Sequence, residues 1–145
     1  MKKIALVALI LSACSLGVFA RGKQPITFEK LPQVVQEEVQ KNFDPSEIQL
    51  VTSKKTAPRH FEYSFNMADG TKIKYTNKAK LCVVENIKGI NVVFVPEKVL
   101  TYIQETFPNA IVTEYKLEYG VHKVELNNEM LLLFTKKGKF IRIDD

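Results

Sequence analysis

The sequence predicts an α+β fold in which two tandem repeats, each a helix plus about four antiparallel strands, share one antiparallel sheet with the helices on one face. Two repetitions in the chain support this fold. The stretch "FTKKGKFIRI" at 134–143 follows the pattern of "YTNKAKLCVV" at 75–84, and "VPEKVLTYIQETF" at 95–107 follows that of "LPQVVQEEVQKNF" at 31–43. One such unit would be too small to bury a stable core, and we expect the second copy to supply the missing partner surface.

Each repeat is predicted to open with a helix. Pro32 and Pro96 stand where proline suits the first helical turn. Apolar residues then recur at every fourth position, which gives each helix one apolar stripe. The stripes consist of Val35, Val39 and Phe43 in the first helix and of Val99, Ile103 and Phe107 in the second.

Alternation of apolar and polar residues predicts the strands that follow each helix. In "HFEYSFNM" at 60–67, every second residue is aromatic or methionine, so one face of this strand is apolar. Turn sequences then separate it from further short strands. These are "TKIKYT" and "KLCVVE" in the first repeat, and "IVTEYKLEY", "HKVEL", "EMLLLFT" and "KFIRID" in the second.

The N-terminal segment is predicted to lie outside the fold. "MKK" followed by a long apolar run that ends at Ala20 is typical of a signal peptide covering residues 1–20, with the mature chain starting at Arg21. A second interpretation is a lipobox, "LSAC", in which Cys14 would be lipidated. We expect no membrane span in the mature chain. The repeats are then predicted to occupy residues 21–88 and 89–145.

Composition excludes several classes of protein. Loss of residues 1–20 removes two lysines and lowers the net charge from +5 to about +3, with both signs interspersed. This balance argues against a nucleic-acid partner. Cys82 would be the single cysteine of the chain cleaved after Ala20, so no internal disulfide can form. A buried, inert thiol is the expected state of Cys82.

The residues quoted above resemble a known family. The runs "PITFEKLP", "FEYSFNMADGTKIKYTNKAK" and "HKVELNNEMLLLFTKKGKFIRIDD" are similar to PepSY-like, β-lactamase-inhibitor-like exported proteins of Bacteroidota, and the likeness covers residues 25–145. The resemblance implies two PepSY-like repeats on a shared sheet and a periplasmic or secreted location. Ala79 departs from the pattern because the second repeat has Gly138 there, and glycine accepts a positive φ more easily.

No enzyme or cofactor motif is present in the sequence. We find no HExxH, CxxC, GxSxG or glycine-rich phosphate loop. His60 and His122 are interpreted as exposed strand-end histidines rather than catalytic or metal-binding groups. Acidic pairs such as Glu114 and Glu118 are too dispersed to predict a calcium site. We therefore expect no catalytic residues, no metal and no cofactor.

One candidate for partner contact is a basic segment that the second repeat lacks. "SKKTAPRH" at 53–60 is predicted to be a solvated loop, and loops on a rigid scaffold often carry binding roles. Its basic residues are Lys54, Lys55 and Arg59.

The other candidate is an apolar patch on the sheet face away from the helices. A three-residue "KKG" loop would place Phe134 opposite Phe140. The patch would then consist of the pairs Leu133 with Ile141 and Leu131 with Ile143. Alternatively, "INVVF" at 90–94, "PITF" at 25–28 or a second copy of the chain covers these residues, because monomers rarely leave such patches exposed.

Together these features predict an exported, non-catalytic module that binds another protein. In the form that the resemblance implies, it inhibits a periplasmic or secreted hydrolase. An alternative is an envelope-tethered accessory lipoprotein, if Cys14 is lipidated, and a hydrolytic enzyme is a third possibility. The sequence does not identify the partner or the oligomeric state.

Overall fold

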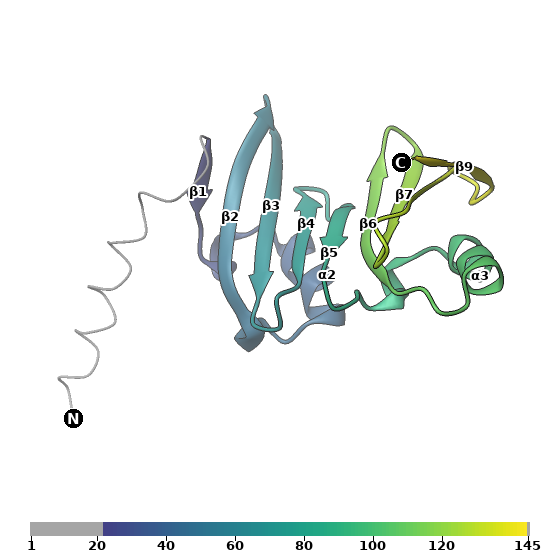
Figure 1. Cartoon of the computed structure of the whole chain (residues 1–145). Coiled ribbons are helices and arrows are strands. Elements are labelled where there is room, and N and C mark those ends of the chain that lie inside the picture. The colour runs from purple at the N-terminus through teal and green to yellow at the C-terminus, as the bar shows by residue number, and fades with distance from the viewer. Residues whose placement is uncertain (1–21, 145) are drawn as a thin grey trace, which may run out of the picture.

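The computed structural model describes residues 22–144 as one nine-stranded sheet with two α-helices (Figure 1). The signal-peptide prediction and Cys14 lie outside the described residues. Every strand pairs antiparallel with its neighbour in sequence, so the order across the sheet is β1 to β9. The first-repeat strands are β1 Lys23–Pro25, β2 Ile48–Ala57, β3 His60–Met67, β4 Lys72–Thr76 and β5 Leu81–Glu85. The second-repeat strands are β6 Val112–Glu118, β7 Val121–Leu126, β8 Leu131–Phe134 and β9 Phe140–Asp144.

The helices occupy equivalent places in the two repeats. They are α2 Gln33–Asn42 and α3 Glu97–Thr106, with short 3-10 turns at Phe28–Lys30, Pro45–Glu47 and Val92–Phe94. Pro32 and Pro96 are the N-cap residues, with φ of −53° and −55°. Their fixed φ prepares the chain for the helix that follows. The predicted α+β fold with two repeats and a shared sheet is confirmed.

The predicted apolar faces form one continuous core between the helices and the sheet. Val35 and Val39 of α2, and Val99 and Ile103 of α3, are buried. The sheet contributes alternate residues of its strands, because successive side chains in a strand point to opposite faces. These include Phe65, Met67, Ile73, Tyr75, Val84, Tyr115, Val124, Leu126, Leu132 and Phe134.

Irregular features of the backbone recur in both repeats. The pairing register shifts between Ile48 and Leu50 in β2, and between Val112 and Glu114 in β6. It shifts again in the last hairpin of each repeat, at Lys74/Tyr75 and at Leu133/Phe134. Shared β-bulges at matching positions show that the second repeat copies the local geometry of the first as well as its hydrophobic pattern.

The turns before β5 and β9 explain how Ala79 replaces a glycine. Ala79 has φ of 58° and Gly138 has φ of 82°, so both lie in the left-handed region. The amide N–H of each donates to the carbonyl oxygen three residues earlier, Thr76 in one turn and Thr135 in the other. Alanine therefore adopts the same turn at an energetic cost that glycine avoids.

Residues 53–60 form part of a hairpin, so the predicted basic loop is wrong. β2 continues to Ala57, which pairs with His60 across a two-residue turn at Pro58 and Arg59. Proline at the first turn position and a positive φ at the second, 60° at Arg59, are typical of a type II turn. The boundary predicted between residues 88 and 89 lies between β5 and α3 and stays a prediction.

Candidate functional site

The face of the sheet away from the helices carries two rows of charge that cross the junction of the repeats. We call it the open face. In one row Glu85, Glu114 and Glu125 are successive cross-strand partners on β5, β6 and β7. In the neighbouring row Lys116 lies opposite Lys123. Cross-strand partners share a face, so each row sets like charges side by side.

Two ion pairs offset part of this repulsion, one within the glutamate row, where Lys72 lies opposite Glu85, and one between the rows. Lys72 lies 2.9 Å from Glu85, and Lys116 lies 3.0 Å from Glu114. Exposed pairs of this kind contribute only about 0–1 kcal/mol each. Among the described residues, no basic nitrogen lies within 4.0 Å of the Glu125 carboxylate. The glutamate row is therefore only partly compensated within the chain.

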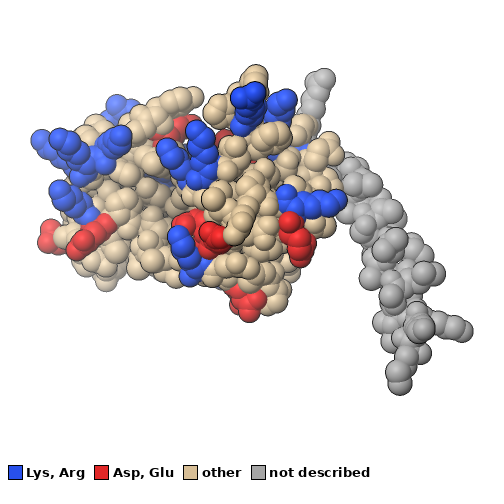
Figure 2. All heavy atoms as spheres, turned by 180° about the vertical axis from the view of Figure 1, so that it is seen from behind, with Lys and Arg blue, Asp and Glu red and all other residues tan. Residues whose placement is uncertain are grey.

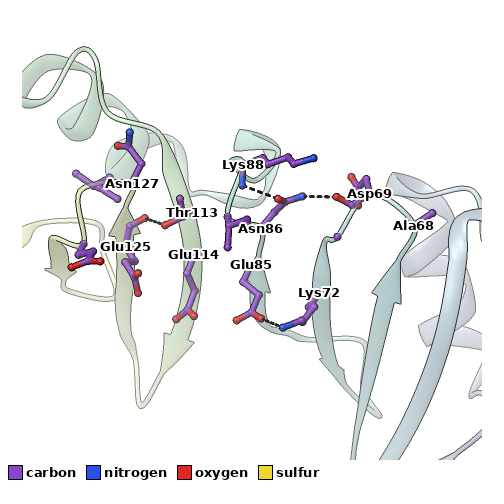
Figure 3. A pocket seen from close by; sticks show the side chains of 14 residues that line it. Ala68, Asp69, Lys72, Glu85, Asn86, Lys88, Thr113, Glu114, Glu125 and Asn127 are labelled. Atoms are coloured by element: carbon purple, nitrogen blue, oxygen red, sulfur yellow. Dashed lines mark hydrogen bonds and ion pairs between the residues drawn. The ribbon is translucent and has the colours of Figure 1, made fainter. Parts of the chain in front are cut away.

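The open face is concave where the two repeats meet. A cavity of about 810 Å³ lies along the glutamate row, and its lining includes the β3–β4 turn, the chain after β5 and the β7–β8 turn (Figure 3). A second cavity of about 370 Å³ lies beside it over β3 to β6, and the two share Lys72, Glu85 and Glu114. A concave surface with convergent polar groups is a common form of binding site.

Asn86 fixes the wall of the larger cavity. Its side chain is buried, and Nδ2 donates to Thr71 Oγ1 at 3.0 Å and to the Asp69 carbonyl at 3.4 Å. Its Oδ1 accepts from the Lys88 amide at 2.9 Å. Figure 3 shows Asn86 between the β3–β4 turn and the chain that leads into the second repeat. These bonds hold the chain after β5 against the β3–β4 turn, and the Asn86 amide N–H donates to the Thr113 carbonyl of the second repeat at 2.9 Å.

The predicted pairing of the apolar patch is wrong. Phe134 does pair with Phe140, but the bulge that follows shifts the register by one residue. Leu133 therefore pairs with Arg142 and Leu131 with Asp144. A one-residue shift moves side chains to the other face of a strand.

The four residues of the predicted patch consequently do not share one surface. Ile143 pairs with the core residue Leu132 and so lies on the helix side. Ile141 is the unpaired residue of the bulge. Leu131 and Leu133 remain on the open face, where they pair with Glu125 and Lys123 and extend the two rows. Leu133 is only 7% exposed.

The three basic candidates of 53–60 are also separated. Lys54 and Lys55 are consecutive in β2 and point to opposite faces of the sheet. Lys54 pairs with Glu62 on the open face, whereas Arg59 lies in the turn. Figure 2, seen from behind the view of Figure 1, shows Lys and Arg in several separate groups with Asp and Glu between them. A further hollow of about 600 Å³ is lined by residues that include Lys98, Lys136, Lys137 and Lys139.

His122 is buried, so its predicted exposure is wrong. The ring Nδ1 lies 2.9 Å from the Tyr115 hydroxyl oxygen, and Nε2 lies 3.1 Å from the Lys136 carbonyl oxygen. A neutral ring that donates from Nε2 and accepts at Nδ1 satisfies both contacts. His122 therefore joins β6, β7 and the last hairpin as a structural group. His60 is exposed, as predicted.

Two further titratable groups, Cys82 and Glu118, have shifted pKa values. Cys82 is half-buried, and burial raises the pKa of its thiol, which favours the unreactive protonated form. A hydrogen bond from Lys123 lowers the pKa of Glu118, which keeps that carboxylate charged. Within residues 22–144, no group of three or more His, Cys, Asp and Glu side chains is arranged to hold a metal ion.

Comparison with known proteins places the chain in a family. Two overlapping segments, residues 20–83 and 61–142, match the family described as "Putative beta-lactamase-inhibitor-like, PepSY-like". The chain belongs to this family. The double match agrees with the two repeats of the structure. None of the curated proteins compared with the chain matches it.

Solved structures of periplasmic proteins have the same fold. One, from Bacteroides thetaiotaomicron, is described as a "putative calcium-regulated periplasmic protein"; it is 22% identical, with a TM-score of 0.76, over 85% of this chain and 97% of that one. Another, from Bacteroides vulgatus, is described as a "putative periplasmic protein from DUF2874 family"; it is 21% identical, with a TM-score of 0.77, over 88% and 100%. In the described part of this PepSY-like chain, no helix has the length and apolar character needed to cross a membrane.

Proposed function

We propose that this PepSY-like protein is an exported, non-catalytic module that binds another protein through its open face. The family description supports a role in binding, and the structural neighbours described as periplasmic support that location. Within residues 22–144 both α-helices pack on the other face, and the open face is hollowed at the junction of the repeats and lined by charged side chains. Leu131, which is half-buried, would supply an apolar part of the same contact surface.

The observation that carries this proposal is the row Glu85, Glu114 and Glu125. Like charges placed directly opposite each other destabilise a sheet by roughly 0.2–1 kcal/mol per pair. Such a row is not what stability alone would favour, and departures of this kind concentrate at functional sites. A partner that places basic groups over the row would remove the repulsion when it binds.

Capture of the partner tests the proposal. Wild-type protein and two variants would be used as bait in periplasmic extract of the native bacterium, and bound proteins would be identified by mass spectrometry. Glu125→Lys reverses one charge of the row, whereas Glu105→Lys makes the same charge change on exposed α3. We expect one protein to bind wild type and Glu105→Lys and to be lost with Glu125→Lys. Equal recovery by all three baits, or recovery by none, would refute binding through this face.

In its narrower form the proposal is inhibition of a periplasmic or secreted hydrolase. The family description supports it, and the open face offers two adjoining hollows that part of an enzyme surface would enter. The captured protein would be assayed for hydrolase activity while the wild-type chain is added. Inhibition should saturate at one chain per enzyme and be weakened by Glu125→Lys but not by Glu105→Lys. Undiminished hydrolysis in the saturated complex would contradict inhibition and leave binding intact.

The tethered alternative depends on "LSAC" at 11–14. Mass spectrometry of the N-terminus of the exported protein distinguishes the two forms. Arg21 as the first residue supports the untethered module, whereas a diacylated Cys14 supports the accessory lipoprotein.

A further inference from the structure

The two edges of the sheet differ in how far they are protected against pairing. β1 is three residues long and contains Lys23 and Pro25, two features that discourage another strand from adding to an edge. β9 is the other edge, and Figure 1 shows it at the opposite end of the sheet. A bulge and the charged Arg142 and Asp144 give β9 some protection, but it contains neither lysine nor proline, and Ile141 and Ile143 are 45% and 39% exposed.

The charges of β9 are complementary to those of a second β9. Arg142 and Asp144 lie on the open face, and in one chain Arg142 Nε approaches Asp144 Oδ1 at 2.9 Å. Ile143 stands between them on the helix side. When two such strands pair antiparallel about an axis at Ile143, each Arg142 lies opposite the Asp144 of the other copy, and the two Ile143 side chains meet.

Other registers of the same pairing are worse. When two identical strands pair antiparallel about a two-fold axis perpendicular to the sheet, one residue must lie opposite its own copy. This follows because cross-strand partners point to the same face of the sheet. An axis at Arg142 sets two guanidinium groups opposite each other, and an axis at Asp144 does the same with two carboxylates. An axis at Ile141 places the bulge at the centre of the ladder. The Ile143 register alone combines apolar contact with two opposite-charge pairs.

We propose that β9 is a self-association edge, through which two copies of the chain form a two-fold dimer with one continuous sheet centred on Ile143. Antiparallel addition of strands satisfies backbone groups that an edge leaves open. A two-fold axis also closes the contact, so each edge is used once and no filament forms. The dimer leaves the glutamate and lysine rows of β5 to β7 accessible, so it does not depend on the proposed partner binding.

The interface is small, so we expect a weak dimer. In the Ile143 register each β9 pairs through three residues, Arg142 to Asp144, which bury less than the 1,200 Å² typical of stable complexes and point to a dissociation constant on the order of 0.1–1 mM. Sedimentation equilibrium over this concentration range measures it directly. A wild-type chain that stays monomeric throughout the range would overturn the proposal.

Charge reversal tests the register. Arg142→Asp places two carboxylates on every β9, and Asp144→Arg places two guanidinium groups there. Each variant alone should associate at least about tenfold more weakly than wild type, because both cross-strand pairs become repulsive. An equimolar mixture should form a heterodimer with nearly wild-type affinity, since opposite charges then face each other. A mixture that remains monomeric while wild type dimerises would overturn the register, and circular dichroism of each variant verifies folding.

Disulfide trapping separates edge pairing from random collision. Cross-strand partners have Cα atoms about 4.5–5.5 Å apart, within the range that a disulfide spans. In a Cys82→Ser background, Ile143→Cys should form disulfide-linked dimers at least about tenfold faster than Ile87→Cys. Ile87 is 92% exposed and is the more accessible control. Equal or faster trapping through position 87 would indicate random collision and contradict the proposal.

Discussion

The matched turns at Ala79 and Gly138 allow a quantitative test of the repeat geometry. Both residues have a positive φ, 58° and 82°. A non-glycine residue in the left-handed region costs about 1–2 kcal/mol, while replacing glycine by alanine recovers about 0.4–1 kcal/mol from the unfolded chain. Ala79→Gly should therefore raise the free energy of unfolding by about 0.5–1 kcal/mol.

The reverse change in the second repeat should be more costly. A Cβ on Gly138 would lie 2.9 Å from Lys98 Cβ, so α3 or the hairpin must shift. Gly138→Ala should lower the free energy of unfolding by about 2 kcal/mol, from backbone strain together with this contact. Gly120→Ala is the matched control, because φ there is 75° and nothing lies within 4 Å of the added Cβ. The loss in free energy of unfolding of Gly120→Ala measures the backbone strain alone.

Urea unfolding monitored by circular dichroism gives the three free energies. We expect Ala79→Gly to be more stable than wild type, Gly120→Ala to be less stable, and Gly138→Ala to be the least stable. If Ala79→Gly lowers the free energy of unfolding, the left-handed turn of the first repeat is wrong. If Gly138→Ala costs no more than Gly120→Ala, the close contact between the last hairpin and α3 is wrong.

Three further predictions concern buried and opposed groups. Burial raises the pKa of Tyr75 from 10.0 to about 12, so the stabilisation from its neutral hydroxyl is complete below pH 10 and is lost as the pH rises toward 12. Unfolding measured at pH 9 and at pH 12 should show Tyr75→Phe losing about 2–3 kcal/mol less than wild type, and equal losses would contradict this. His122→Phe leaves the Tyr115 hydroxyl and the Lys136 carbonyl without their partner and should cost about 2 kcal/mol in urea unfolding, while His60→Phe should change little. Glu125→Lys converts a like-charge pair with Glu114 into an opposite-charge pair, so its melting temperature should equal or exceed that of wild type, and a clear decrease would argue against the repulsive row.

The sequence was sufficient to predict the repeats and most of the core. Regular alternation in 60–67 placed Phe65 and Met67 on the buried face, and the four-residue spacing of Val35 and Val39 placed α2 on the sheet. These patterns depend on residues close together in the sequence, so the sequence alone predicts them. Prolines at equivalent positions indicate where both helices begin.

The surface could not be predicted because it depends on register. One extra residue in the last hairpin moves Ile143 to the helix side and brings Arg142 and Asp144 to the open face. No residue type in the hairpin predicts that bulge. The acidic row joins Glu85 and Glu114, which are separated in the sequence by the whole of α3. The predicted exposure of His122 is wrong because a strand end is usually exposed, whereas here the last hairpin covers the ring.

Chemical labelling of lysines tests the central claim, that the open face binds the partner, most directly. Lys116 and Lys123 lie on that face, whereas Lys41 and Lys98 are exposed on the helices. Amine labelling of the captured complex, read by mass spectrometry and compared with the free chain, should show protection of Lys116 and Lys123 and no change at Lys41 and Lys98. Protection confined to Lys41 or Lys98, with Lys116 and Lys123 labelled as in the free chain, would contradict it.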